Sequence, residues 1–190
     1  MSVIKQAFSS LLLVLLLTHA RDARTAATSS TMEDTCKRFA GGDQAGHDYD
    51  FCMKTLGADP ESANLDAYDL AVDAVYMAMS AARATGARIA RLQLAETVPA
   101  RRECLNKCAA EYDVTVRRLS DAGSYAYVSG SEHLQKAQTL LAETLGAPLR
   151  CDRAFTAAGQ RSPLSSTDYE LNEAIGLALT ILPAPPTPKP

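Results

Sequence analysis

Several residue types and motifs are scarce or missing in this sequence. It has no tryptophan, three histidines among 190 residues, and only 6% aromatic residues. No Gly-X-Ser-X-Gly elbow, phosphate-cradling glycine loop or His-Glu-X-X-His pair occurs. Asn-X-Ser/Thr is also absent, which argues against N-glycosylation. An enzyme is therefore the least favoured class, and no catalytic residue is expected.

Long apolar runs are absent beyond the N-terminus. Residues 1–20 combine Lys5, an apolar run at 11–17 and a small residue before a possible cleavage site, which is the pattern of a secretory signal peptide. The run is shorter than the about 20 residues that span a bilayer, so a retained anchor is disfavoured. We expect cleavage after Ala20, with Ala27 as a second candidate, and no membrane association afterwards.

The charge balance is mildly acidic. Removing Lys5 with the signal peptide changes the formal net charge from 19 − 22 = −3 to 18 − 22 = −4. This argues against nucleic acid and anionic membranes as partners. We expect a disordered linker at 21–32, one domain at 33–182 with its own core, and a Pro-rich disordered tail at 183–190.

Apolar periodicity predicts helices along the domain. Two short helical patterns at 33–57 suggest a hairpin, and Pro60 or Ser62 then begins a helix. A long helix to about Leu94 has a seam at alternating spacings of three and four. The seam consists of Leu65, Tyr68, Val72, Val75, Met79, Ala82, Gly86 and Ile89.

Three more helical segments follow. The second long helix opens at Pro99, buries Leu105, Cys108, Tyr112, Val116 and Leu119, and ends in a turn near 123–130. The third buries Leu134, Ala137, Leu141 and Leu145 before Gly146 and Pro148 break or kink it. The last is capped by Ser166 or Thr167 and buries Leu171, Ile175, Ala178 and Leu182. With no period-two stretch, the fold is all-α: a helical hairpin, then an up-down-up-down four-helix bundle.

Five cysteines lie beyond the leader, and in a secreted chain cysteines are expected to form bridges. Spacing alone does not decide the pairing. Cys36, His47 and Cys52 could instead be zinc ligands, but they lack the paired Cys-X2-4-Cys of structural zinc sites. We therefore expect disulfides, with no metal or cofactor.

Four segments, taken in order, resemble a known family. They are Thr35-Cys36-Lys37 with Tyr49-Asp50-Phe51-Cys52-Met53-Lys54-Thr55-Leu56-Gly57-Ala58-Asp59-Pro60, then Leu105-Asn106-Lys107-Cys108-Ala109-Ala110-Glu111-Tyr112-Asp113, then Cys151-Asp152-Arg153-Ala154-Phe155, and finally the stretch 171–182. Together they resemble the plant invertase and pectin methylesterase inhibitor family over roughly residues 33–182. The most similar branch is that of short pollen-type proteins named "putative invertase inhibitor".

The resemblance implies the cysteine pairing and the fold. It pairs Cys36 with Cys52, which staples the N-terminal hairpin, and Cys108 with Cys151, which antiparallel neighbouring helices can bring together. Cys104 is extra. We favour a buried free thiol; an intermolecular disulfide and competition with Cys108 for Cys151 remain open.

The resemblance also implies a function. It predicts a secreted inhibitor that forms a 1:1 complex with an acid invertase or a pectin methylesterase in the apoplast, cell wall or vacuole, and blocks the substrate cleft sterically. Known invertase inhibitors of the family carry Pro-Lys-Phe between the second and third bundle helices. Here the corresponding residues are Ser131-Glu132-His133-Leu134, so the motif is absent.

We predict that residues 121–134 and the facing helices contact the target. The residues proposed for binding are Tyr125, Tyr127, Glu132 and His133, because exposed aromatic side chains commonly anchor interfaces. The alternative is that the tyrosines are ordinary core residues at a helix end. A function from another class is a secreted helical carrier of a small apolar ligand, or an allergen-like wall protein without inhibitory activity.

Overall fold

The structure, a computed structural model, describes residues 31–41, 47–128 and 130–184. The chain separates into two compact units, Met1–Leu70 and Ala71–Pro190. Every regular element in those ranges is a helix, which confirms the all-α prediction. The predicted signal peptide, most of the linker and residues 185–190 of the tail lie outside the described residues, so their boundaries remain predictions.

In the first unit, two helices form a stapled hairpin. Residues 31–39 are helical, and α2 covers His47–Leu56. The Cys36–Cys52 disulfide joins them with a Cα–Cα distance of 5.5 Å. Both sulfurs are buried together with Leu56. The bridge therefore lies in the buried interior between the two helices.

Short polar caps connect this hairpin to the first long helix. Pro60 begins only a short 3-10 helix, η1 (Pro60–Asn64), whose first turn Asp59 caps by accepting from the Glu61 N–H at 2.9 Å. The long helix α3 (Ala67–Ala95) begins after Asp66. The Asp66 carboxylate accepts from the backbone N–H groups of Tyr68 and Asp69 at 2.8 and 2.9 Å, which satisfies two otherwise unpaired donors.

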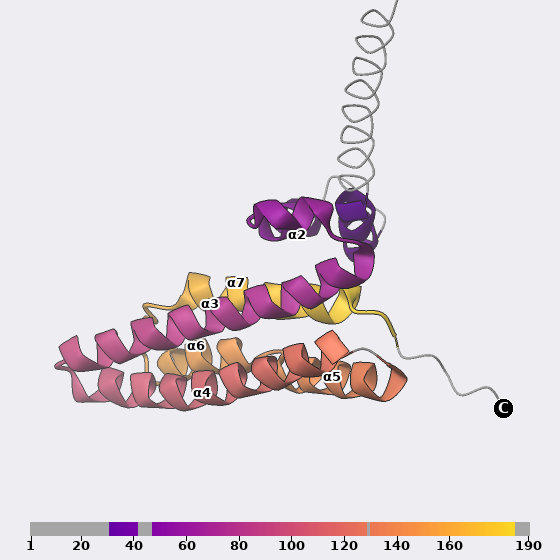
Figure 1. The fold of residues 1–190 in the computed structure, drawn as a ribbon. Coiled ribbons are helices and arrows are strands. Elements are labelled where there is room, and N and C mark those ends of the chain that lie inside the picture. The colour runs from indigo at the N-terminus through magenta and orange to yellow at the C-terminus, as the bar shows by residue number, and fades with distance from the viewer. Residues whose placement is uncertain (1–30, 42–46, 129, 185–190) are drawn as a thin grey trace, which may run out of the picture. The chain divides into compact units, whose positions relative to one another are not determined.

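The second unit is the predicted up-down-up-down bundle (Figure 1). After α3 come α4 (Pro99–Val128), α5 (Ser131–Thr144), α6 (Ala147–Ala157) and α7 (Ser165–Ile181). Helices α5 and α6 follow one another on the return path beside α4, so together they serve as the third bundle helix (Figure 1). The Cys108–Cys151 disulfide joins α4 to α6 with a Cα–Cα distance of 4.6 Å.

The break in the third bundle helix occurs where Gly146 and Pro148 predict it. Gly146 has φ +80°, in the left-handed region, and Pro148 lies in the first turn of α6. The Asn172 side chain of α7 accepts a hydrogen bond from the Gly146 N–H at 2.8 Å. Leu145, predicted to point inward, is 40% exposed because it ends α5 where the chain turns.

The predicted seam of α3 is only half correct. Its buried members are Val72, Val75, Ala82 and Ile89, whereas Leu65, Tyr68, Met79 and Gly86 are half-buried. The buried stripe also includes Leu70, Ala71, Ala74, Ala78 and Thr85. A pattern built mainly on large residues missed the three alanines and Thr85. Leu70 was missed because a seven-residue repeat drifts around a helix with 3.6 residues per turn.

Two predictions for α4 are also wrong. The helix continues through Gly123 to Val128, although a turn was expected from residue 123. A Cβ atom on Gly123 would lie 3.1 Å from the Tyr76 ring, so this glycine permits close packing rather than a turn. Val116 is half-buried, and Thr115 is buried beside it.

The start of α7 differs from the prediction as well. Neither Ser166 nor Thr167 caps it: the N-cap residue is Leu164, with no side-chain cap hydrogen bond. Thr167 instead accepts a hydrogen bond from Arg88 of α3 at 3.0 Å, and Arg88 also donates to the Pro163 carbonyl at 2.9 Å. The predicted inward residues of α7 are buried: Leu171, Ile175, Ala178 and, just beyond its end, Leu182.

Candidate functional site

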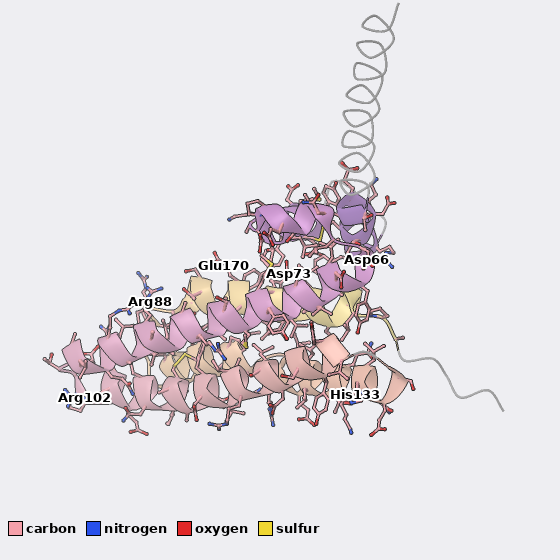
Figure 2. All side chains as sticks on the ribbon, viewed as in Figure 1. Asp66, Asp73, Arg88, Arg102, His133 and Glu170 are labelled. Carbon is pink, nitrogen blue, oxygen red and sulfur yellow. A yellow bond between two sulfur atoms is a disulfide. The ribbon has the colours of Figure 1, made fainter. Side chains whose placement is uncertain are left out.

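The proposed binding residues gather where α4 ends and α5 begins. We call the group formed by Tyr125, Tyr127, Glu132, His133 and Lys136 the α4–α5 tip. Glycine shapes the connection, because Gly130 at the N-cap of α5 has φ +91° and ψ 148°, a conformation that L side chains rarely adopt. His133 and Arg102 lie at opposite ends of the bundle (Figure 2).

Within the α4–α5 tip, three side chains from two helices contact one another. The rings of Tyr125 and His133 have centroids 5.9 Å apart and are tilted by 36°. The Lys136 ammonium lies 5.5 Å from the centroid of the Tyr125 ring, within the range of a cation–π interaction. Tyr125 and His133 are both half-buried. These contacts hold the end of α4 against the first turn of α5.

Charges at the α4–α5 tip are paired along α5. Lys136 Nζ donates to Glu132 Oε1 at 2.7 Å, an i,i+4 pair on an exposed helix face. The hydrogen bond and charge of Lys136 lower the pKa of Glu132, and those of Glu132 raise the pKa of Lys136. Both groups therefore stay charged across the physiological pH range. The pair is exposed, so its main effect is to orient the side chains rather than to stabilise the fold.

The Tyr127 side chain lies on the surface and not in the core. Its side chain is 74% exposed, and the neighbouring Val128 is 59% exposed. The alternative that the tyrosines are core residues is therefore wrong for Tyr127, whereas Tyr125 is only half-buried. Tyrosine is among the residues enriched at interface anchors, so Tyr127 is the candidate anchor of this tip.

The opposite end of the bundle also exposes apolar side chains, which the sequence pattern did not reveal. Leu94, near which the long helix was predicted to end, is 89% exposed, and Val98 in the α3–α4 turn is 44% exposed. Glu96 holds this turn by accepting from the Val98 N–H at 2.9 Å and pairing with Arg101 at 2.9 Å. This end provides a structurally separate surface against which the α4–α5 tip can be compared.

The cysteines are placed as the resemblance implies. Cys36–Cys52 and Cys108–Cys151 are disulfides, which consume the thiolates that a zinc site would need. Cys104 is a free, buried thiol whose Sγ lies 3.4 Å from the Ala154 carbonyl of α6. Among the described residues, no cluster of three or more His, Cys, Asp or Glu side chains could hold a metal ion.

One buried carboxyl group was not singled out by the sequence analysis. Asp168 of α7 has no exposed surface and accepts a hydrogen bond from Tyr112 Oη of α4 at 2.5 Å. Its spacing could have revealed it, because Asp168 lies three and seven residues before the buried Leu171 and Ile175. This pair lies in the interior, away from the tip.

Comparison with known proteins identifies relatives of this chain. Residues 16–181 match the sequence model of the family described as plant invertase/pectin methylesterase inhibitor. Proteins named "Putative invertase inhibitor" from Platanus orientalis and Platanus acerifolia are each 28% identical to it over 162 residues, 82% of this chain. The matches cover 91% and 86% of those relatives. In the described part of the chain, no helix combines the length and apolar character that crossing a membrane requires.

Proposed function

Because the chain belongs to the plant invertase/pectin methylesterase inhibitor family, we propose that it is a secreted inhibitor of an acid invertase or a pectin methylesterase. As a member of a family of inhibitors, it is not an enzyme. The observation that supports this proposal most strongly is a family match that spans residues 16–181, which includes both stapled units. We place its action in the apoplast or cell wall, with the vacuole as a second compartment.

The proposed mechanism is steric and depends on rigidity. A preorganised surface loses less conformational entropy on docking, so more of the contact free energy remains as affinity. The Cys108–Cys151 bridge joins α4 to α6, and Arg150, next to Cys151 on α6, donates to Glu111 of α4 at 2.9 Å. These links support a bundle that covers the target's substrate cleft in a 1:1 complex without changing shape.

The proposed contact surface is the α4–α5 tip. Tyr127 and Val128 supply exposed apolar area, and Tyr125, His133 and Lys136 are held together beside them. An interface anchor of this kind typically contributes at least about 2 kcal/mol, or about 30-fold in affinity. Substitution of such an anchor at the α4–α5 tip is therefore expected to weaken binding by a similar factor.

The choice of target is best made by parallel assays. The two Platanus relatives are named for invertase, which favours an acid invertase as the first enzyme to test. Residues 131–134 read Ser-Glu-His-Leu and not Pro-Lys-Phe, so any invertase contact at this end must use different side chains. Tyr127 and His133 are the residues that we propose in their place.

The experiment titrates the mature, oxidised protein into an acid invertase and, separately, into a pectin methylesterase. We expect saturable inhibition of one enzyme at a 1:1 ratio, weakened about 10- to 100-fold by Tyr127→Ala and less by His133→Ala. Leu94→Ala is the matched control, since it removes an exposed apolar side chain from the other end of the bundle. If Leu94→Ala weakens inhibition and the other two substitutions do not, the contact surface lies at the α3–α4 end of the bundle.

Two further outcomes would remove the proposal altogether. Full activity of both enzymes in the presence of excess protein would exclude the proposed function for these targets. Saturable binding of a fluorescent fatty-acid probe, together with that result, would favour the carrier hypothesis instead. Circular dichroism of each variant confirms that any lost inhibition does not come from unfolding.

A further inference from the structure

The interior of the bundle contains a carboxyl group of which only one oxygen has a hydrogen-bond partner among the described residues. Asp168 Oδ1 accepts from Tyr112 Oη at 2.5 Å, whereas Oδ2 has no hydrogen-bond partner among the described residues. The Asp168 side chain has no exposed surface. A buried carboxylate with an unpartnered oxygen is costly, and a proton on that oxygen removes the charge. The arrangement suits the neutral acid better than the anion.

Three helices meet at this carboxyl group. Tyr112 belongs to α4 and Asp168 to α7, and Thr85 of α3 acts on Tyr112, where it opposes the rise that burial and Asp168 produce in the Tyr112 pKa. Thr85 and Tyr112 are 4% and 2% exposed, so water has little access to the link. The residues that form it are separated by 56 positions between α4 and α7, and the link therefore reports on tertiary packing rather than on any single helix.

Titratable groups on α3, α4 and α6 act on Asp168. Arg88 of α3 favours its anion, but Thr167 and the Pro163 carbonyl already accept from its guanidinium. Asp152 of α6 opposes the anion, and Ser165 donates to Asp152 Oδ1 at 2.5 Å. Tyr112 of α4 favours the anion through its hydrogen bond. Burial outweighs these contributions and raises the pKa of Asp168 from 3.8 to about 6.

We propose that the buried Tyr112–Asp168 site acts as an acid-stabilised clamp: the packing of α7 against α3 and α4 is most stable when Asp168 is protonated and is destabilised when Asp168 ionises, because the unpartnered Oδ2 then shares a charge that is buried away from water. The clamp is a property of the fold and does not depend on which enzyme, if any, the protein inhibits. The free energy of unfolding of the bundle would therefore be higher in an acidic compartment than near neutral pH. The sequence alone could not show it, because the spacing of Asp168 indicates a buried position but does not reveal its partner Tyr112, 56 positions away.

The sign of the pH dependence follows from linkage. The folded protein binds the Asp168 proton more tightly than the unfolded chain does, so the proton stabilises the fold. This stabilisation is complete below about pH 3.8, declines as the pH rises and is lost above about 6. Between pH 5 and pH 7.5, the contribution of Asp168 to the folding equilibrium constant falls about tenfold.

The test compares urea unfolding of the mature, oxidised protein at pH 5 and pH 7.5 with that of Asp168→Asn. The amide cannot ionise, so we expect the stability difference between wild type and Asp168→Asn to change about tenfold in equilibrium constant, in favour of the variant at pH 7.5. Glu170→Gln is the matched control, because Glu170 is an exposed carboxylate on the same helix (Figure 2) and its removal should leave the profile unchanged. If the unfolding free energies of Asp168→Asn and wild type change by the same amount between pH 5 and pH 7.5, the proposal is wrong.

A second measurement covers the case in which Asp168→Asn does not fold. Carboxyl carbon NMR of the wild-type protein reports the titration of Asp168 directly, and a midpoint near 6 would support the clamp. A midpoint at or below about 4.5 would overturn it. Tyr112→Phe supplies a further check, since removing the donor should move the Asp168 midpoint to higher pH.

Discussion

Removing the Cys108–Cys151 bridge should cost about as much stability as truncating a large core side chain. The two cysteines are 43 residues apart in sequence, so the bridge closes a loop of about 44 residues. On the chain-entropy model, such a loop contributes about 4 kcal/mol by restricting the unfolded chain. We therefore expect Cys108→Ala/Cys151→Ala to lose about 2–5 kcal/mol of unfolding free energy.

The double substitution avoids an ambiguity that either single one would create. Cys104 lies one turn before Cys108 on α4 and is a buried free thiol. With one bridge partner left, Cys104 and that partner could form a new disulfide. With both replaced, Cys104 is the only cysteine left in the second unit, and intact mass with thiol labelling verifies its state.

The assay is urea unfolding followed by circular dichroism at fixed pH, because the chain has no tryptophan to report by fluorescence. Since the bridge acts on the unfolded state, its loss should lower the midpoint and also raise the slope m, as the unbridged chain expands further. Cys104→Ala is the control, expected to cost about 1 kcal/mol with no change in m. A loss below about 1 kcal/mol for the double variant, with m unchanged, would refute this reasoning.

Other substitutions test individual contacts by the same unfolding assay. Asn172→Ala removes the acceptor for the Gly146 N–H at the break of the third bundle helix and should cost about 1 kcal/mol; an unchanged stability would mean that water replaces the amide. Gly86→Ala should stabilise α3 by about 0.5–1 kcal/mol, because a Cβ atom there meets nothing within 4 Å. Gly123→Ala should gain less or lose stability, because its Cβ atom would lie 3.1 Å from the Tyr76 ring; equal effects at the two glycines would contradict the close packing.

Sequence patterns were most reliable for the existence and order of the helices. Pro99 begins α4, and Gly146 with Pro148 separates α5 from α6, because these residues constrain their own backbone. The same reasoning was wrong at Gly123. A glycine that ends a helix and a glycine that admits a neighbouring ring look alike until the neighbour, Tyr76, is known.

The candidate site was predictable as a region but not as an arrangement. The turn between the second and third bundle helices could be placed from sequence, and the tyrosines near it could be named. Their different exposures could not: Tyr127 points into solvent, whereas Tyr125 lies against His133. Adjacent positions on a helix end differ in direction by about 100° each, so a small shift in where the helix ends exchanges their roles.

Local chemistry in the sequence was enough to determine an all-α chain of stapled helices, since helix periodicity, prolines and cysteines act over a few residues or through motifs shared with the family. Only the tertiary structure decided which small residues of α3 line the core, how the α4–α5 tip is assembled, and that Asp168 meets Tyr112 across 56 positions. The physical reason is that burial and hydrogen bonding between distant segments depend on how helices rotate and stack. A one-residue shift in a helical face changes the identity of every contact while leaving the helix itself intact.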